Sequence, residues 1–184
     1  MLKNTNQVDA FQLKQLEQLR VLCKTTDGST PNLYTHILEQ PRVFPASLLY
    51  YEQGQLIGFL GTYFFYEDAV EISLLINPFY RRRGIARTLI NSILPLIKSQ
   101  NYHKLIFSNP AQINNEWLHA LGFSYMHSEY YMERDDLNPL LHYKQTLTFH
   151  TATVNDIPLL CEFDAACFPS KEVDSTERFQ HLID

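Results

Sequence analysis

The segment from residue 72 to residue 90 constrains the fold of this 184-residue chain more than any other. It reads ISLLINPFYRRRGIARTLI, an apolar strand that ends at Pro78, a short basic turn, and Gly84 at the start of an amphipathic helix. The N–H groups of such a turn, and of the first helical turn, have no partners within the secondary structure, and the helix dipole adds partial positive charge. The order of these elements therefore predicts a site for an anion such as phosphate.

The side chains of this turn agree with that prediction. Arg81, Arg82 and Arg83 carry guanidinium groups, which donate charge-assisted hydrogen bonds suited to phosphate. Gly84 allows the backbone to approach a phosphate closely, and the small side chain of Ala86 lets the start of the helix lie close to that phosphate. Alone, an arginine triplet is more often a solvated surface and a glycine only a turn residue, but the complete order is much rarer than its pieces.

The rest of the first 135 residues predicts an α/β domain of the α+β kind, in which a mixed, mostly antiparallel sheet has helices on both faces. A helix capped by Asp9 is expected to open the domain, and residues 1–8 are too polar to suggest a strand. The other expected elements are a helix over 33–39, strands over 47–51, 56–66 and 70–76, a helix over 84–100 with a kink or an early end at Pro95, a strand over 104–108, a helix over 114–121 and an extended segment over 124–134.

Composition excludes several classes of protein. There are 15 Lys and Arg residues against 20 Asp and Glu, a net charge of −5, which does not favour a nucleic-acid binder. The longest uncharged apolar stretch, over residues 56–66, is shorter than the roughly 18 residues that a membrane span needs. The three cysteines lack a metal-type spacing and suggest free thiols. We therefore expect a cytoplasmic protein without a metal, a nucleic-acid partner or a membrane segment.

The basic turn resembles the signature of the GNAT superfamily of N-acetyltransferases, which is Arg or Gln, two residues, Gly, one residue, then Gly or Ala. In this chain the signature is Arg81-Arg82-Arg83-Gly84-Ile85-Ala86. The preceding residues 76–80 (INPFY) are a common lead-in, and the order of elements over residues 1–135 is similar to that of the family. The resemblance implies a GNAT-like fold for this part of the chain.

The resemblance also implies a co-substrate, acetyl-CoA or another acyl-CoA. Its pyrophosphate would lie on the N–H groups of residues 81–86, including Ile85. Its pantetheine arm would follow the strand that ends at Leu75 and Ile76, where that strand diverges from residues 104–108. Asn114 is a candidate for the amide arm, although a plain helix cap is the more common role of such a residue.

For the chemistry, Glu71 is the candidate base, because it resembles the acidic residue that many members of the family use as base or to hold a water. Strand alternation sets it on the face opposite Ile72 and Leu74. The alternative is a solvent-facing glutamate. Many members of the family place a tyrosine, as the acid for the thiolate, where this chain has Leu118. Tyr130 is the preferred substitute over Tyr125 and Tyr131, although such tyrosines commonly only fill a sheet.

Two functions remain open at this point. The first is an acetyl-CoA-dependent N-acetyltransferase that acetylates a primary amine of a small molecule or a peptide. The alternative is a non-catalytic acyl-CoA-binding or protein-interaction module with the same fold.

The tail predicts a second region after a connector at residues 136–146. A strand over 147–153 and a helix capped by Asp156 resemble the opening of a second, incomplete GNAT domain over residues 147–184. The alternative is that this strand pairs with the edge of the first sheet, in the same molecule or in a homodimer.

Overall fold

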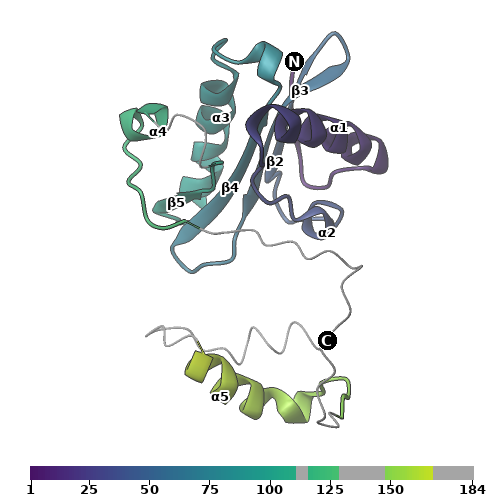
Figure 1. The fold of residues 1–184 in the computed structure, drawn as a ribbon, viewed down its shortest axis with the longest axis vertical. Helices are drawn as coiled ribbons and strands as arrows, with labels where there is room; N and C mark the ends of the chain where they lie inside the picture. Colours follow the sequence, from purple (N-terminus) through teal and green to yellow (C-terminus); the bar gives the residue numbers. More distant parts are fainter. Residues whose placement is uncertain (111–115, 129–147, 168–184) are drawn as a thin grey trace. The chain divides into compact units, whose positions relative to one another are not determined.

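The computed structural model describes residues 1–110, 116–128 and 148–167, and the chain divides into two compact units, Met1–Tyr130 and Tyr131–Asp184 (Figure 1). The first unit holds a five-stranded sheet in the order β1-β2-β3-β4-β5. The strands are β1 (Leu2–Thr5), β2 (Ser47–Glu52), β3 (Gln55–Tyr63), β4 (Ala69–Ile76) and β5 (Lys104–Phe107). Strands β1 to β4 pair antiparallel and β5 joins β4 in parallel. This is the mixed, mostly antiparallel sheet that the sequence predicts.

Helices cover both faces of the sheet, as expected (Figure 1). One face packs under α1 (Ala10–Asp27) and α2 (Thr35–Leu38), and the other under α3 (Ile85–Ser99). The alternation along β4 explains this division, because Leu75 packs with α1 residues such as Leu16, whereas Ile72 packs with Leu89 of α3. A short helix, α4 (Glu116–Ala120), follows β5 in the chain.

The two longer helices follow their local signals. Asp9 caps α1, as the sequence predicts, and forms a reciprocal capping box with Gln12, while Gly28 ends the helix after Asp27 in the left-handed conformation. In α3 the helix continues through Pro95 to Ser99. The expected early end at this proline is therefore wrong, because the apolar face, which includes Ile93 and Ile97, stays packed against the sheet.

The N-terminus corrects one expectation. Residues 2–5 form β1, which pairs with β2 from Leu2↔Tyr50 to Thr5↔Ser47. The polar sequence is compatible with a strand here because β1 lies at the edge of the sheet, where Lys3 and Asn4 stay exposed. The N-terminus therefore supplies the first strand of this sheet.

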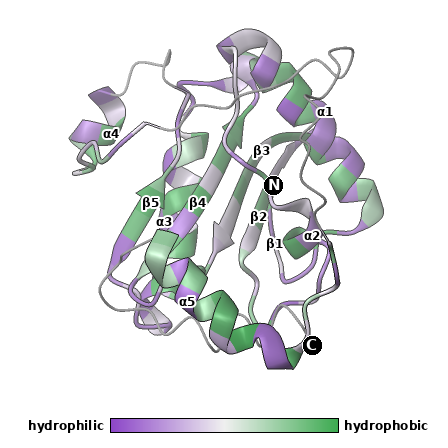
Figure 2. Cartoon of the chain, turned by 60° about the horizontal axis from the view of Figure 1, so that its bottom comes forward, coloured by the Kyte–Doolittle hydropathy of each residue, from purple (hydrophilic) through white to green (hydrophobic). Residues whose placement is uncertain are grey.

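The second unit also differs from the expectation. Residues 148–153 form no strand, Leu147 lies outside the described residues, and Phe149 is 85% exposed. Thr153 and Asp156 form a capping box around a short 3-10 turn, which leads into α5 (Ile157–Cys167). Much of α5 is hydrophobic (Figure 2), and its Leu159 and Phe163 are exposed. No helix among the described residues is both long and apolar enough to cross a membrane.

Candidate functional site

The sheet opens between β4 and β5. The two strands pair only from Ala69↔Lys104 to Ile72↔Phe107, whereas β3 accompanies β4 as far as Gly58↔Ile76. Within the described residues, the second half of β4 therefore has no strand on its β5 side. This opening is the divergence that the sequence resemblance implies for the pantetheine arm.

The backbone of this open edge has a defined polarity. The N–H of Asn77 donates to the Ile57 carbonyl at 2.9 Å, which identifies these two residues as a hydrogen-bonded pair of the antiparallel ladder. Because such pairs alternate, the N–H and C=O of Leu75 point to β3, and those of Leu74 and Ile76 point to the open edge. Leu74 and the Ile76 N–H can thus pair with an extended ligand, and the Ile76 N–H is a donor suited to an oxyanion.

The signature turn presents a row of backbone donors. A 3-10 turn at Pro78–Tyr80 follows β4, and Arg82 and Gly84 then take left-handed conformations with φ of 63° and 80°. Within the described chain, the N–H groups of residues 82–86 make no backbone hydrogen bond, and the first such bond at α3 runs from Thr88 N–H to Gly84 O. Consecutive free N–H groups at a helix start form a concave anion site.

The Arg81 side chain has a different position from the one expected. Its guanidinium pairs with both carboxylate oxygens of Asp27, at 2.8 and 2.5 Å, and its Nε donates to the Ile76 carbonyl at 3.2 Å. The pairing with Asp27 is the main cause that raises the pKa of Arg81. The Arg81 N–H also donates weakly to Pro78 O at 3.5 Å. Arg81 therefore holds the turn in place, and its donors are not directed at a phosphate.

The other two arginines remain accessible. Arg82 is exposed, and Arg83 lies with its guanidinium carbon 4.8 Å from the centre of the Tyr80 ring and 4.0 Å, by its Nη1, from Glu52. Both contacts of Arg83 are long and partly solvated, so they leave its charge available. The predicted anion site thus combines backbone donors from residues 82–86 with two exposed cations beside them.

Glu71 lies on the α1 and α2 face of β4, as alternation predicts, but it is buried, with 7% of the residue exposed. The reading of a solvent-facing glutamate is therefore wrong. The Tyr34 hydroxyl, from the segment before α2, donates to Glu71 Oε1 at 3.0 Å. Burial and the negative charge of Glu71 raise the pKa of Tyr34, so this phenol stays protonated as a donor. No sequence signal connects these two residues, which lie 37 positions apart.

Two hydroxyl groups lie near Glu71 on the same face. Ser73 Oγ donates to the Asn32 carbonyl, which ties the segment before α2 to β4. Tyr63 is paired with Glu71 across β3 and β4, and its buried hydroxyl has no hydrogen-bond partner in the described part of the chain. Burial raises the pKa of Tyr63 to about 12. The site thus combines a buried carboxylate with neutral phenols.

The structure describes only some of the remaining candidate residues. Asn114, Tyr130 and Tyr131 lie outside the described residues. Leu118 of α4 is buried and carries no proton to give. Tyr125 is 72% exposed, and its hydroxyl lies 3.0 Å from Ser128 Oγ. No described residue therefore takes the place of the tyrosine that the family resemblance leads one to expect.

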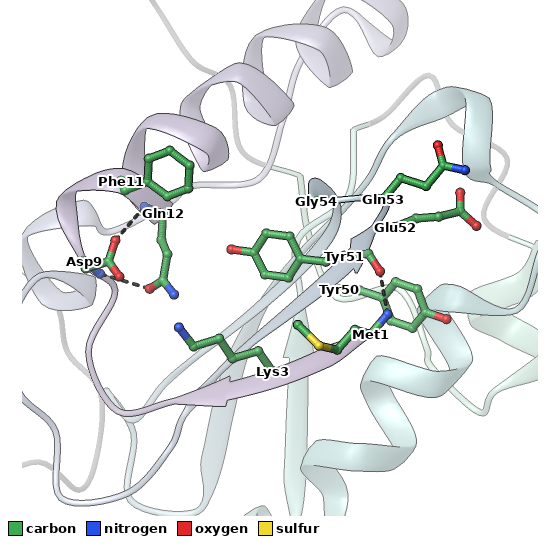
Figure 3. Close-up of a pocket in the computed structure, with 10 residues that line it drawn as sticks. All are labelled: Met1, Lys3, Asp9, Phe11, Gln12, Tyr50, Tyr51, Glu52, Gln53 and Gly54. Carbon is green, nitrogen blue, oxygen red and sulfur yellow. Dashed lines mark hydrogen bonds between the residues drawn. The ribbon is translucent and has the colours of Figure 1, made fainter.

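A separate groove on the described surface lies elsewhere (Figure 3). It has a volume of about 570 Å³ and is lined by β1, the N-terminal end of α1 and the β2–β3 turn, with Lys3, Asp9 and Tyr51 among its residues. It contains neither Glu71 nor the signature turn. The open edge of β4 and the N–H groups of residues 82–86 provide more specific chemistry than this groove.

Comparison with known proteins agrees with this geometry. The family model described as "Acetyltransferase (GNAT) family" matches residues 13–123. No significant match was found among curated proteins.

Three solved structures illustrate the similarity. A predicted acetyltransferase with acetyl-CoA from Clostridium acetobutylicum has 16% identity and a TM-score of 0.53, over 72% of this chain and 96% of that chain. N-acetylglutamate synthase from Neisseria gonorrhoeae, complexed with coenzyme A and N-acetyl-glutamate, has 17% identity and a TM-score of 0.51, over 66% of this chain and 28% of that one. Aminoglycoside N-acetyltransferase AAC(6')-Iy, in complex with CoA, has 20% identity and a TM-score of 0.49, over 73% and 100%. At these identities the similarity concerns the fold.

Proposed function

The chain belongs to the GNAT family of acetyltransferases, and we propose that it transfers the acetyl group of acetyl-CoA to a primary amine of a small molecule or a peptide. The observation that carries this proposal is the unpaired edge of β4, which leads directly to the free N–H groups of residues 82–86. An extended arm that ends in a pyrophosphate fits this combination, because the edge pairs with amides and the turn accepts an anion.

In this proposal the residues of the site have separate roles. Leu75 and Ile76 form the strand end along which the pantetheine arm lies, and the Ile76 N–H donates to the oxygen of the thioester carbonyl. The N–H groups of residues 82–86 bind the pyrophosphate, and the side chains of Arg82 and Arg83 add charge. Asn114 and Tyr130 stay predictions from the sequence.

Glu71 is the proposed base. A primary alkyl amine is protonated at neutral pH, so it must lose a proton before its nitrogen can attack the thioester carbonyl carbon. A carboxylate held in place on β4 can accept that proton and then release it to solvent. Because Leu118 has no proton to donate, the departing thiolate takes its proton from Tyr130, as the sequence predicts, or from the attacking amine or water.

A non-catalytic acyl-CoA-binding module is the second candidate, and the leucine at position 118 favours it. Calorimetry with acetyl-CoA and an assay of thiol release over a broad panel of amines separate the two. Binding with thiol release above background for at least one amine supports the transferase. Binding without release for any amine favours the module, and absence of binding contradicts both.

A further inference from the structure

The tyrosine that contacts the Glu71 carboxylate belongs to an aromatic cluster. The Tyr34 ring meets the rings of Tyr63 and Phe65 edge-on, with centroids 4.7 and 4.9 Å apart, and the latter two rings stack at 5.7 Å. Tyr63 is only 1% exposed and anchors the cluster, whereas Phe65 is 47% exposed and Tyr34 is half-buried. Tyr34 and Phe65 therefore keep surface that a ligand can reach, whereas Tyr63 is covered.

The same phenol that belongs to the cluster holds the carboxylate. Because the Tyr34 hydroxyl donates to Oε1, it restricts the rotation of the Glu71 side chain and occupies that oxygen. Its own segment is fixed, since Ser73 donates to the carbonyl of Asn32, two residues earlier. The segment before α2 is thus connected to β4 at two neighbouring points, and it sets the orientation of the carboxylate.

The charges around the cluster favour the binding of a cation. Glu71 is buried among aromatic rings, and Glu67 is exposed on the turn between β3 and β4. Arg42, which acts electrostatically on Tyr63, directs its guanidinium to the Thr62 carbonyl and the Ser47 hydroxyl. A carboxylate beside accessible aromatic faces is an arrangement that binds alkylammonium groups by ion pairing and cation–π attraction.

We propose that Tyr34 positions Glu71 for proton abstraction and that Tyr34 and Phe65 form the aromatic wall of an acceptor site for a primary alkylammonium group. The inference rests on the proposed function. Glu71 takes one proton from the ammonium, and the neutral nitrogen forms a bond to the thioester carbonyl carbon. The carbon–sulfur bond breaks, the second amine proton passes to the thiolate, and Glu71 releases its proton to water.

The test of the positioning role uses Tyr34→Phe, which removes the hydroxyl and keeps the ring. With n-hexylamine as acceptor, we expect kcat/KM to fall about tenfold, with the KM for acetyl-CoA unchanged. Because the lost hydrogen bond stabilised the charged carboxylate, the acidic limb of the pH profile moves to higher pH. The phenols of Tyr34 and Tyr63 both face Glu71, and Tyr63 stays in place in this variant.

Tyr50→Phe is the matched control, because Tyr50 lies in the separate groove of Figure 3 and its hydroxyl makes no hydrogen bond within the described residues. It is expected to keep the wild-type rate and pH profile, and thermal unfolding checks that both variants are folded. A Tyr34→Phe enzyme with the wild-type rate and the wild-type acidic limb overturns the positioning role.

The acceptor class is tested with Phe65→Leu and with two amines of different charge. The site predicts that n-hexylamine, a cation at pH 7, is preferred over aniline, which is neutral there, and that Phe65→Leu raises the KM for n-hexylamine about tenfold with little change in kcat. Preference for aniline, no use of n-hexylamine by an enzyme that acetylates other amines, or an unchanged KM in Phe65→Leu overturns the acceptor assignment. A wild-type protein that acetylates no amine contradicts the proposed function itself.

Discussion

The guanidinium of Arg81 and the carboxylate of Asp27 form a two-pronged ion pair between residues 54 positions apart, with N–O distances of 2.8 and 2.5 Å. The pair joins the last turn of α1 to the turn before α3. Since the same guanidinium donates to the Ile76 carbonyl, one side chain connects α1, the end of β4 and the signature turn. The shape of the anion site therefore depends on this ion pair.

Asp27→Asn removes the charge of the acceptor while keeping its shape. We expect unfolding to become easier by about 1 kcal/mol, because Arg81 is partly solvated and the pair is screened. We also expect the Kd for acetyl-CoA, measured by calorimetry, to rise several-fold as the turn loosens.

Glu17→Gln is the matched control, since Glu17 pairs with Arg20 on the exposed side of the same helix. Its effect on stability is expected to stay within about 0.5 kcal/mol, and its Kd for acetyl-CoA should equal that of the wild type. Equal Kd values for Asp27→Asn and Glu17→Gln would show that the Arg81 contact does not shape the site.

Gly84→Ala tests the backbone at the start of α3. Gly84 has a φ of 80° and nothing within 4 Å of an added Cβ, so alanine would suffer backbone strain of about 1–2 kcal/mol without a steric clash. Relief of that strain would turn the N–H groups of the turn away from the pyrophosphate. We expect both lower stability and at least tenfold weaker binding of acetyl-CoA.

Gly54→Ala separates these two effects. Gly54 has nearly the same φ, 81°, and the same open surroundings, but it lies in the turn between β2 and β3. The loss of stability should be similar and acetyl-CoA binding should be unaffected. If both alanine variants bind acetyl-CoA equally well, the pyrophosphate does not lie on the signature turn.

Much of this fold could be predicted, because it depends on signals between neighbouring residues. The capping box at Asp9, the alternation that turns Glu71 toward α1, and the strand, turn and helix order around Gly84 are all encoded by neighbouring residues. The sequence does not indicate β1, because an edge strand needs few apolar residues. The strand predicted over 147–153 is absent from its described residues, 148–153, since a short segment of β-prone residues forms a strand only where a neighbouring strand can pair with it.

The contacts that build the site, in contrast, join residues that lie far apart in the sequence. Tyr34 meets Glu71 across 37 residues, and Asp27 meets Arg81 across 54. Nothing in the spacing or composition of either pair suggests the contact, because the packing of α1 and α2 on the sheet creates it. For the same reason the sequence predicts that the Arg81 guanidinium binds phosphate, whereas in the fold it pairs with the carboxylate of Asp27.

Tyr63 predicts a specific dependence of stability on pH. Burial raises its pKa from an ordinary 10 to about 12, so the folded protein keeps the phenolic proton over a range in which the unfolded chain loses it. The contribution is constant below pH 10 and is lost as the pH rises from about 10 to about 12. Over this window we expect roughly 2–3 kcal/mol of the free energy of unfolding to disappear.

The comparison of wild type with Tyr63→Phe isolates this group from the other tyrosines. At neutral pH the variant should be as stable as the wild type or more so, because it removes a buried hydroxyl without a partner among the described residues. Above pH 10, denaturant unfolding should show the wild type losing stability faster than the variant. Parallel curves over that window would contradict the assigned cause.

The most direct test of the account is the rate of thiol release from acetyl-CoA by the wild type and by Glu71→Gln, with the amine that the wild type acetylates fastest. Calorimetry on both proteins checks that they bind acetyl-CoA equally. If Glu71 is the base, the variant should bind acetyl-CoA as the wild type does and turn over at least about a hundredfold more slowly. A Glu71→Gln protein that acetylates the amine within threefold of the wild-type rate would contradict the account.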